Sequence, residues 1–498
     1  MKKVAILGGG VGALTTAFEL TESPDWKSGQ YEATVYQLGW RLGGKGASGR
    51  NRTYCQRIEE HGLHVWFGFY DNAFNLMQRC YAALGRAPGT PLATWQEAFT
   101  AQDEVVYEEH INGVWKHWPM RFRPNCLVPG VIAAHPNEWG YLRLVLEWMH
   151  GQFQASRHSP PERMHPRHSG WRRSLAAWVR RVLHALHIDP WATDIEAYWL
   201  EQAVRLAGQL GPDPAQHRDE DHQELCRLLQ DFLRWLWGRV EKTVFQNDDD
   251  RHLWILLDLG TAVITGMLAD DVISKGFGSI DGVEFRAWLR KHGAHELLTL
   301  QSGPIRAGYD LPFAYRQGDI NQPCIGAGTG LSDLLRLVLD YRGHIMWRMN
   351  AGMGDTIFTP LYQVLRERGV KFKFFQRVTG LHLSADGQEI ERIDVEQQAT
   401  VKDGAEYQPL VTVQDLPCWP SEPLYDQLED GQVLQQLHEQ YLTDPESAWF
   451  PLPDSMRKPA TLLKGQDFDK VVLGISIGAL PNVCPELIAA STDWQQMI

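Results

Sequence analysis

A run of small residues near the N-terminus has the composition of a phosphate cradle. Gly8-Gly9-Gly10-Val11-Gly12-Ala13 follows the short apolar run Lys3–Leu7 and precedes apolar residues at helical spacing. In a strand–turn–helix of this kind, the first glycine makes the tight turn and the second lets the backbone approach a pyrophosphate, while a small third residue lets the helix sit close to the strand. Backbone amides at the helix start then hold the anion. We assign Gly8, Gly10, Gly12 and Ala13 to a dinucleotide site.

A second segment carries groups suited to the same ligand. The predicted strand Ala33–Tyr36 ends at Gln37, the position where an acidic residue would take the ribose hydroxyls. Gln37 can still hydrogen-bond a ribose, but without a charge. Downstream, Arg41-Leu42-Gly43-Gly44-Lys45 places a glycine doublet between two cations, which can lay backbone amides and positive charge along a diphosphate.

The most distinctive run in the chain extends from Glu60 to Asn72, with the letters EHGLHVWFGFYDN. Gly62 permits close backbone approach. His64, beside apolar residues, is either a hydrogen-bond donor or proton shuttle or a satisfied core histidine. Glu59 and Glu60 are either acid–base groups or exposed carboxylates at a strand end. His61 and His64 lack a third ligand at metal-site spacing, so we expect no metal and assign no secure catalytic residue.

These residues need a scaffold, and the chain supplies one in three parts: 1–125, 126–345 and 346–498. The middle part is predicted to be mainly helical. Its candidate helices are 138–154, 171–187, 193–210, 223–244 and 252–273, separated by proline- and glycine-rich breaks. We expect an α-helical insertion in an α/β nucleotide-binding domain that is assembled from discontinuous segments.

The segment 157–187 is unusual by charge, with seven Arg and five His against a single acidic residue. Within it, Trp171, Leu175, Trp178, Val182 and Leu186 recur at helical spacing. Arginines opposite such a stripe suit an anionic membrane surface. The alternative is an ordinary amphipathic helix that packs its apolar face into the core.

The last third of the chain returns to α/β patterning. A glycine-containing segment ending at Asp355 precedes a predicted helix, 360–368, a strand, 371–375, and a second strand, 380–383, entered through Val378. Asp355 is a candidate helix cap. A further apolar strand and turn occupy 471–481.

Composition excludes several classes of function. The net charge of −13 argues against nucleic-acid binding. The seven cysteines form no CxxC motif and favour a reducing compartment. No targeting segment is visible, and the longest apolar stretch, 253–268, is shorter than the roughly 20 residues that span a bilayer. We therefore expect a cytoplasmic protein that is soluble or peripheral on a membrane.

The opening GGGVGALTTA and VYQLGWRLGGK, the run from Glu60, and the segments around Val378 and 471–481 resemble the FAD-dependent amine oxidase and carotenoid desaturase superfamily, and the run from Glu60 is similar to phytoene and ζ-carotene desaturases. The resemblance implies a Rossmann-like FAD-binding domain. It places Arg41 at the flavin diphosphate, Gly62, Leu63 and His64 beside the flavin ring, and the Val378 backbone at the adenine. Gln37 departs from the family's acidic residue.

Relatives of this kind continue beyond the 471–481 strand to a Gly-Asp motif, which this sequence does not show. We therefore expect a second polypeptide to supply that part. The resemblance implies hydride abstraction from a C–H bond next to carbon or nitrogen of a small, apolar substrate, with electrons passed to quinone or oxygen. The alternatives are an amine or amino-acid oxidase, a non-catalytic nucleotide-binding scaffold and a nicotinamide-binding protein without flavin.

Overall fold

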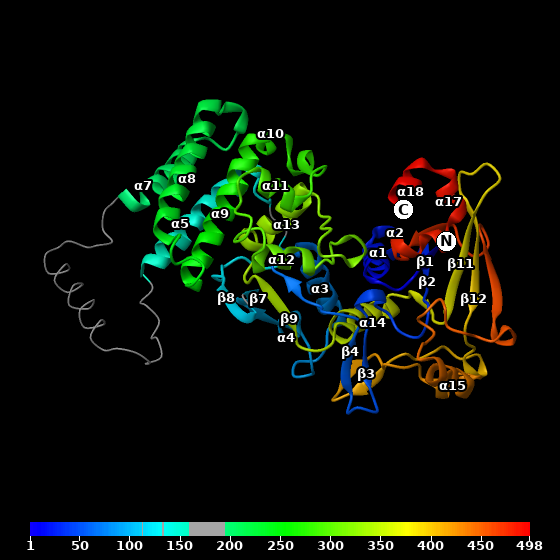
Figure 1. The fold of residues 1–498 in the computed structure, drawn as a ribbon. Coiled ribbons are helices and arrows are strands. Elements are labelled where there is room, and N and C mark those ends of the chain that lie inside the picture. Colours follow the sequence, from blue (N-terminus) through cyan, green and yellow to red (C-terminus); the bar gives the residue numbers. More distant parts are fainter. Residues whose placement is uncertain (112, 132–133, 159–194) are drawn as a thin grey trace. The chain divides into compact units, whose positions relative to one another are not determined.

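The computed structural model describes residues 1–111, 113–131, 134–158 and 195–498, and it divides the chain into two units (Figure 1). Unit 1 comprises Met1–Gln102, Val128–Ile132 and Met346–Ile498, and unit 2 comprises Asp103–Leu127 and Ala133–Ile345. The first division lies after Gln102 and not at residue 125 as expected. The residues in between form a β-hairpin that belongs to the helical unit.

A four-stranded parallel sheet organises unit 1. Its order is β10-β2-β1-β16, built from β10 (Lys371–Lys373), β2 (Tyr31–Tyr36), β1 (Lys2–Leu7) and β16 (Lys470–Leu473). Leu7 lies opposite both Tyr36 and Leu473 in the register. The carboxyl ends of three strands therefore meet at one edge, where open α/β sheets bind their ligands.

Both faces of this sheet are covered, because successive side chains of a strand point to opposite faces. Val4 and Ile6 of β1 belong to the core that contains α1 (Val11–Glu22) and α14 (Thr359–Glu367). Ala5 and Leu7 belong to a second core with α16 (Leu480–Val483) and the antiparallel sheet of β11 (Gln376–Leu383), β12 (Ile390–Gln397) and β15 (Lys458–Leu463). The mixed α/β fold with a parallel Rossmann-like sheet is confirmed.

The rest of unit 1 consists of small sheets and short helices around this centre. β5 (Trp66–Phe67), β9 (Met346–Met349) and β6 (Phe99–Gln102) form an antiparallel sheet in the order β5-β9-β6. The remaining helices and strands are α2 (Pro24–Lys27), β3 (Ser48–Asn51), β4 (Arg57–Glu60), α3 (Asp71–Leu84), α4 (Trp95–Ala98), β13 (Val411–Val413), β14 (Leu416–Cys418), α15 (Gly431–Tyr441), α17 (Pro485–Ala490) and α18 (Thr492–Met497).

Unit 2 is mainly helical, as the sequence predicts. Its helices are α5 (Glu138–His158), α7 (Ile195–Gln209), α8 (Asp219–Val240), α9 (Asp248–Ala269), α10 (Val272–Lys275), α11 (Phe285–Lys291), α12 (Gly303–Asp310) and α13 (Ala327–Leu339). α5, α7, α8 and α9 pack through one apolar core. The expected helix 171–187 and, apart from the end of α5, the basic segment 157–187 lie outside the described residues.

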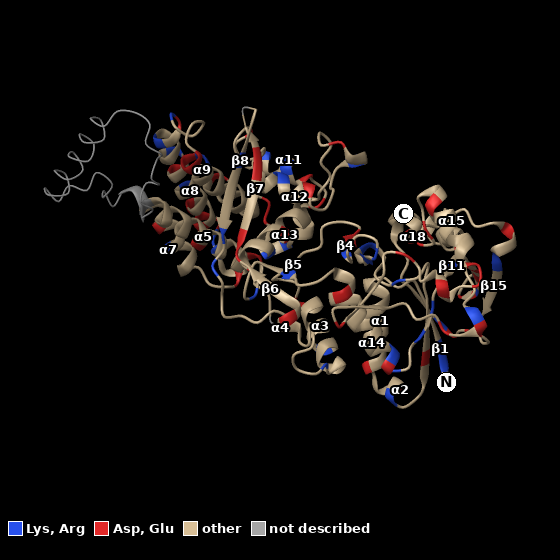
Figure 2. Ribbon diagram, turned by 90° about the horizontal axis from the view of Figure 1, so that it is seen from below, with Lys and Arg blue, Asp and Glu red and all other residues tan. Residues whose placement is uncertain are grey.

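The hairpin of β7 (Glu104–Ile111) and β8 (Val114–Arg121) joins unit 2 through a buried ion pair. Arg251 of α9 donates to Glu109 of β7 at 2.7 Å, and the amide of Gly303 donates to the other carboxylate oxygen at 2.8 Å. Figure 2 shows the acidic residues of β7 in red. This pairing explains why the first division precedes the hairpin.

Helix α9 corrects one expectation from the sequence. With 22 residues it is long and apolar enough to cross a membrane by length and composition, because it extends beyond the apolar stretch 253–268. However, 78% of its apolar window is buried inside the protein. The central helix of a soluble protein meets the same criterion.

Candidate functional site

The glycine turn closes the edge of the parallel sheet. Gly8 has φ +98°, and its amide donates to the carbonyl of Tyr36 at 2.8 Å. A Cβ on Gly8 would lie 2.8 Å from the carbonyl oxygen of Gly474, and one on Gly474 would lie 2.6 Å from the Cβ of Ala13. β1, β16 and α1 can therefore approach this closely only with glycine at positions 8 and 474 and a small residue at position 13.

The start of α1 is open. Gly10 is its N-cap, with no side-chain cap, and no acidic residue occupies the first turn. A Cβ on Gly10 or Gly12 would meet no atom within 4 Å. The positive end of the helix dipole and the first-turn amides therefore border free space, which is the arrangement that binds a diphosphate.

The glycine doublet lies directly against this turn. The amide of Gly43 donates to the carbonyl of Gly9 at 2.8 Å, and a Cβ on Gly44 would lie 3.4 Å from the Cα of Gly10. Lys45 follows in the short turn η1 (Gly44–Gly46) and is exposed. In the part of the chain that the structure describes, no carboxylate pairs with its ammonium group. The two glycine segments of the sequence thus form one continuous surface.

Arg41, expected at the diphosphate, forms an ion pair with Glu446. Its guanidinium binds Glu446 through both carboxylate oxygens, at 2.8 and 2.7 Å, and lies 3.2 Å from Nε2 of His61. The side chains of Arg41 and Glu446 are both largely buried. Burial raises the pKa of Glu446, although Arg41 acts in the opposite direction. A diphosphate would have to displace Glu446 to reach this guanidinium.

Gln37, expected at the ribose, also turns inward. It is 7% exposed, its amide nitrogen donates to the carbonyl of Leu38, and its amide oxygen packs under Gly9. Its backbone is held by β10 and β11, because its amide donates to Lys373 and its carbonyl accepts from Gln376, both at 2.8 Å. A ribose at this strand end therefore meets neither an acidic group nor a free amide from residue 37.

The run from Glu60 reaches the glycine doublet. Nδ1 of His64 lies 3.0 Å from Glu60, and Nε2 lies 3.4 Å from the carbonyl of Lys45. Glu60 is not simply an exposed strand-end carboxylate, because it also accepts from the amide of Met353 at 2.7 Å. It therefore connects β4, the doublet and the segment before α14. His64 is hydrogen-bonded on both ring nitrogens, as a structural histidine would be.

The remaining expected site residues are Gly62, Leu63 and Val378. Gly62 and Leu63 are exposed, Leu63 at 77%, and a Cβ on Gly62 would meet nothing within 4 Å. Val378 lies in β11, opposite Val395 of β12 and two residues after Gln376. The contacts of these residues with a cofactor stay predictions.

Asp355 does not cap a helix. It is 1% exposed and accepts twice from Arg50, at 3.0 and 2.7 Å. Burial raises its pKa, and Arg50 counteracts this effect. The pair joins β3 to the π-helix η5 (Gly354–Phe358) and so holds the segment that Glu60 contacts.

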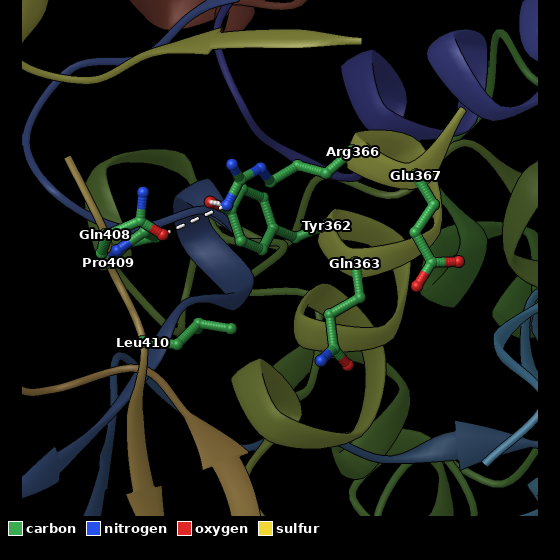
Figure 3. Close-up of a pocket in the computed structure, with 7 residues that line it drawn as sticks. All are labelled: Tyr362, Gln363, Arg366, Glu367, Gln408, Pro409 and Leu410. Carbon is green, nitrogen blue, oxygen red and sulfur yellow. Dashed lines mark hydrogen bonds between the residues drawn. The ribbon is translucent and has the colours of Figure 1, made fainter. Parts of the chain in front are cut away.

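A separate cavity of about 420 Å³ is lined in part by residues of α14 (Figure 3). It is lined by Tyr362, Gln363, Arg366, Glu367, Gln408, Pro409 and Leu410. The guanidinium of Arg366 lies over the Tyr362 ring and already donates to Gln408 at 3.2 Å and Glu406 at 2.8 Å. None of the expected cofactor residues lines it, so we assign it no part in the site.

Metal binding has no support in the described residues. Across 1–111, 113–131, 134–158 and 195–498, no group of three or more His, Cys, Asp or Glu side chains is placed to hold an ion. His61 contacts Arg41 instead.

Comparison with known proteins agrees with the sheet and the glycine turn. Residues 6–80 match a family model described as an NAD(P)-binding Rossmann-like domain. No curated protein matches the sequence. The match and the parallel strand order agree on a Rossmann-like fold for this part of the chain.

Two solved structures illustrate the wider similarity. Wild-type putrescine oxidase bound to putrescine is 12% identical, with a TM-score of 0.30 over 79% of this chain and 54% of that chain. An oxidoreductase from Methanosarcina mazei is 10% identical, with a TM-score of 0.25 over 81% and 56%. The matches thus span little more than half of these proteins, and the fold assignment rests on residues 6–80 and on the strand order.

Two residues of this region carry no signal in the sequence. Glu446 is separated from Arg41 by 405 positions, and no motif surrounds it. Nothing in the sequence around Lys373 distinguishes this lysine, and only the strand register shows that it lies opposite Tyr36.

Proposed function

We propose that the chain binds FAD at the sheet edge and is a flavin-dependent oxidoreductase. The observation that carries the proposal is the contact between the two glycine segments, with Gly44 against Gly10, beside an open helix start. Simple nicotinamide dehydrogenases have no need of the second segment. Its presence therefore favours a flavin dinucleotide.

Different residues of the site would bind different parts of FAD. The first-turn amides after Gly10 and the ammonium of Lys45 would neutralise the diphosphate, while Gly8 and Ala13 keep the turn close to the sheet. Gly62 and Leu63 would border the ring. FAD, when bound, accepts the hydride, and the protein orients the substrate and excludes water.

For the substrate, we propose an apolar molecule that loses a hydride from a C–H bond, as in carotenoid desaturation. The similarity of the run from Glu60 to desaturases supports this choice, and the high Trp content agrees with an apolar partner. An amine or amino-acid substrate is the alternative within the same superfamily. A partner chain and peripheral membrane attachment through 157–187 also stay proposals.

Cofactor retention in a Gly10→Trp variant tests the site. The indole would fill the space that the diphosphate needs, so we expect the purified variant to release no flavin on denaturation. Because a Cβ at position 10 meets no atom, the fold itself should tolerate the side chain. Thr16→Ala, on the exposed side of the same helix, is the matched control and should retain the wild-type amount. Full flavin retention by Gly10→Trp would refute the proposal.

A second candidate function is a non-catalytic nucleotide-binding scaffold. Two observations favour it: Arg41 is held by Glu446, and Gln37 is turned away from the ribose. Native mass spectrometry of the chain co-expressed with its genomic neighbours separates the candidates. FAD in the complex would support the oxidoreductase, whereas a chain without nucleotide bound to a partner would support the scaffold.

A further inference from the structure

A second cavity in unit 1, of about 280 Å³, is lined by none of the expected cofactor residues. One of its walls is the end of β3 with the turn after it (50–53), and another is the segment 420–426. Backbone hydrogen bonds hold the two walls together, because the amide of Arg50 donates to the carbonyl of Trp419 at 2.8 Å and the amide of Ser421 donates to the carbonyl of Arg50 at 3.1 Å. The cavity is therefore pre-formed and of a size that suits a small polar molecule.

The β3 wall carries an unpaired cation. Arg50 is already neutralised, because its guanidinium donates to Asp355 at 3.0 and 2.7 Å. Arg52 lies two residues further along and is exposed, and no carboxylate of the described residues forms an ion pair with it. A guanidinium with free N–H groups can bind a carboxylate through two parallel hydrogen bonds.

A buried hydroxyl adds a second donor. Tyr425 lines the same cavity, and its hydroxyl oxygen is buried without a hydrogen-bond partner in the part of the chain that the structure describes. Burial and then the nearby carboxylates, Glu422 first among them, raise the pKa of Tyr425, so the hydroxyl keeps its proton. Because a buried polar group without a partner is costly, an oxygen atom of a ligand would supply a favourable acceptor.

The opposite wall carries two unpaired carboxylates. Glu422 and Asp426 line the cavity and are exposed, and neither carboxylate forms an ion pair with a cation of the described residues. The ammonium of Lys402 donates at 2.9 Å to the backbone carbonyl of Asp426 and not to its carboxylate. The unpaired carboxylates of the cavity therefore outnumber the unpaired guanidinium of Arg52.

A ligand that matches these charges has one carboxylate and more than one ammonium group. We infer that the cavity binds an α-amino acid with a cationic side chain, with its carboxylate on Arg52 and Tyr425 and its ammonium groups toward Glu422 and Asp426. No residue of the proposed dinucleotide site takes part. This inference and the proposed function can therefore fail independently.

Three probes with related carbon chains separate the contacts. They are L-lysine, L-norleucine, which lacks the side-chain ammonium, and cadaverine, which lacks the carboxylate. Calorimetry on the full chain as purified measures the affinity of each. Because hydrogen bonds to charged groups are stronger than neutral ones, we expect L-lysine to bind about 10-fold more tightly than either analogue. Added salt should reduce this difference.

A pair of arginine variants on one hairpin tests the carboxylate contact. Arg52→Gln should weaken L-lysine about 10-fold and leave cadaverine unchanged. Arg57→Gln removes the same charge from β4, where Arg57 lies 3.4 Å from Glu59 and does not line the cavity, and should leave all three affinities unchanged.

Two further variants test the other contacts. Tyr425→Phe should weaken L-lysine without lowering the free energy of unfolding, because the hydroxyl has no hydrogen-bond partner to lose. Glu422→Gln combined with Asp426→Asn should make the affinities for L-lysine and L-norleucine equal.

Absence of L-lysine binding would overturn the inference, and so would equal affinities of the wild-type chain for L-lysine and either analogue. Unchanged L-lysine binding by Arg52→Gln would place the ligand elsewhere and would overturn it as well. Flavin retention, measured with Gly10→Trp, decides the proposed function separately.

Discussion

Position 8 offers a sharp test of the sheet-edge geometry. Gly8→Ala would place a methyl group 2.8 Å from the carbonyl oxygen of Gly474, at a φ of +98° that L-residues rarely adopt. The backbone strain costs about 1–2 kcal/mol. The displacement of a packed backbone costs a further ~1–3 kcal/mol. Neighbouring atoms cannot relax easily, because the amide of Gly474 is hydrogen-bonded to Leu7 at 2.8 Å.

We therefore expect Gly8→Ala to lower the free energy of unfolding by about 2–5 kcal/mol, which for a chain of 498 residues corresponds to a Tm decrease of about 2–5 °C. Gly12→Ala is the matched substitution, since its Cβ meets nothing within 4 Å and it lies in α1. Replacing a helical glycine by alanine stabilises by roughly 0.5–1 kcal/mol. Scanning fluorimetry at equal nucleotide content compares the two variants. Equal Tm values would refute the close packing of the glycine turn on β16.

Three further predictions follow from ion pairs. Glu446→Gln should free Arg41 for a diphosphate and tighten FAD binding about 10-fold, and unchanged affinity measured by fluorescence titration would show that Arg41 has no part in the site. Burial alone would raise the pKa of Glu109, but hydrogen bonds from its neighbours, including Arg251, lower it to about 2 from 4.5. Its stabilising effect is complete above pH 4.5 and lost as the pH falls toward 2. Glu109→Gln should thus cost ~3 kcal/mol at neutral pH and progressively less in acid, as denaturation at several pH values will show. Asp355→Ala should cost ~3 kcal/mol by leaving the Arg50 charge buried and unpaired, and a loss below 1 kcal/mol in urea denaturation would contradict this.

The sequence predicts local features of the fold well. The first strand, the glycine turn and α1 follow from a short apolar run, glycines and helical spacing, all of which are contiguous. Helices α5, α7, α8 and α9 of unit 2 are predicted for the same reason, with ends displaced by a few residues, as where the expected helix 223–244 corresponds to α8 (Asp219–Val240), whereas α11, α12 and α13 are not predicted. The hairpin β7–β8 was grouped with the wrong part, because its ion pair with α9 joins residues 142 positions apart.

The candidate site is predictable in part. The chemistry of Gly8, Gly10 and the glycine doublet depends on residue type and order, so the sequence shows it. The orientation of Gln37 and the partner of Arg41 depend on tertiary contacts. Gln37 and Leu42 both pack under Gly9, and Glu446, which binds Arg41, lies in a loop far away in the sequence. No local pattern encodes such contacts.

The strand order of the parallel sheet has a consequence for folding during protein synthesis. β1 lies between β2, which follows it closely in the sequence, and β16, which is synthesised only after the whole of unit 2. At a synthesis rate of roughly 5–20 residues per second, β1 waits on the order of tens of seconds for that neighbour. Meanwhile the helical unit, which ends at Ile345, is complete and can fold. We therefore expect the nascent chain to expose one apolar strand edge to chaperones throughout this interval.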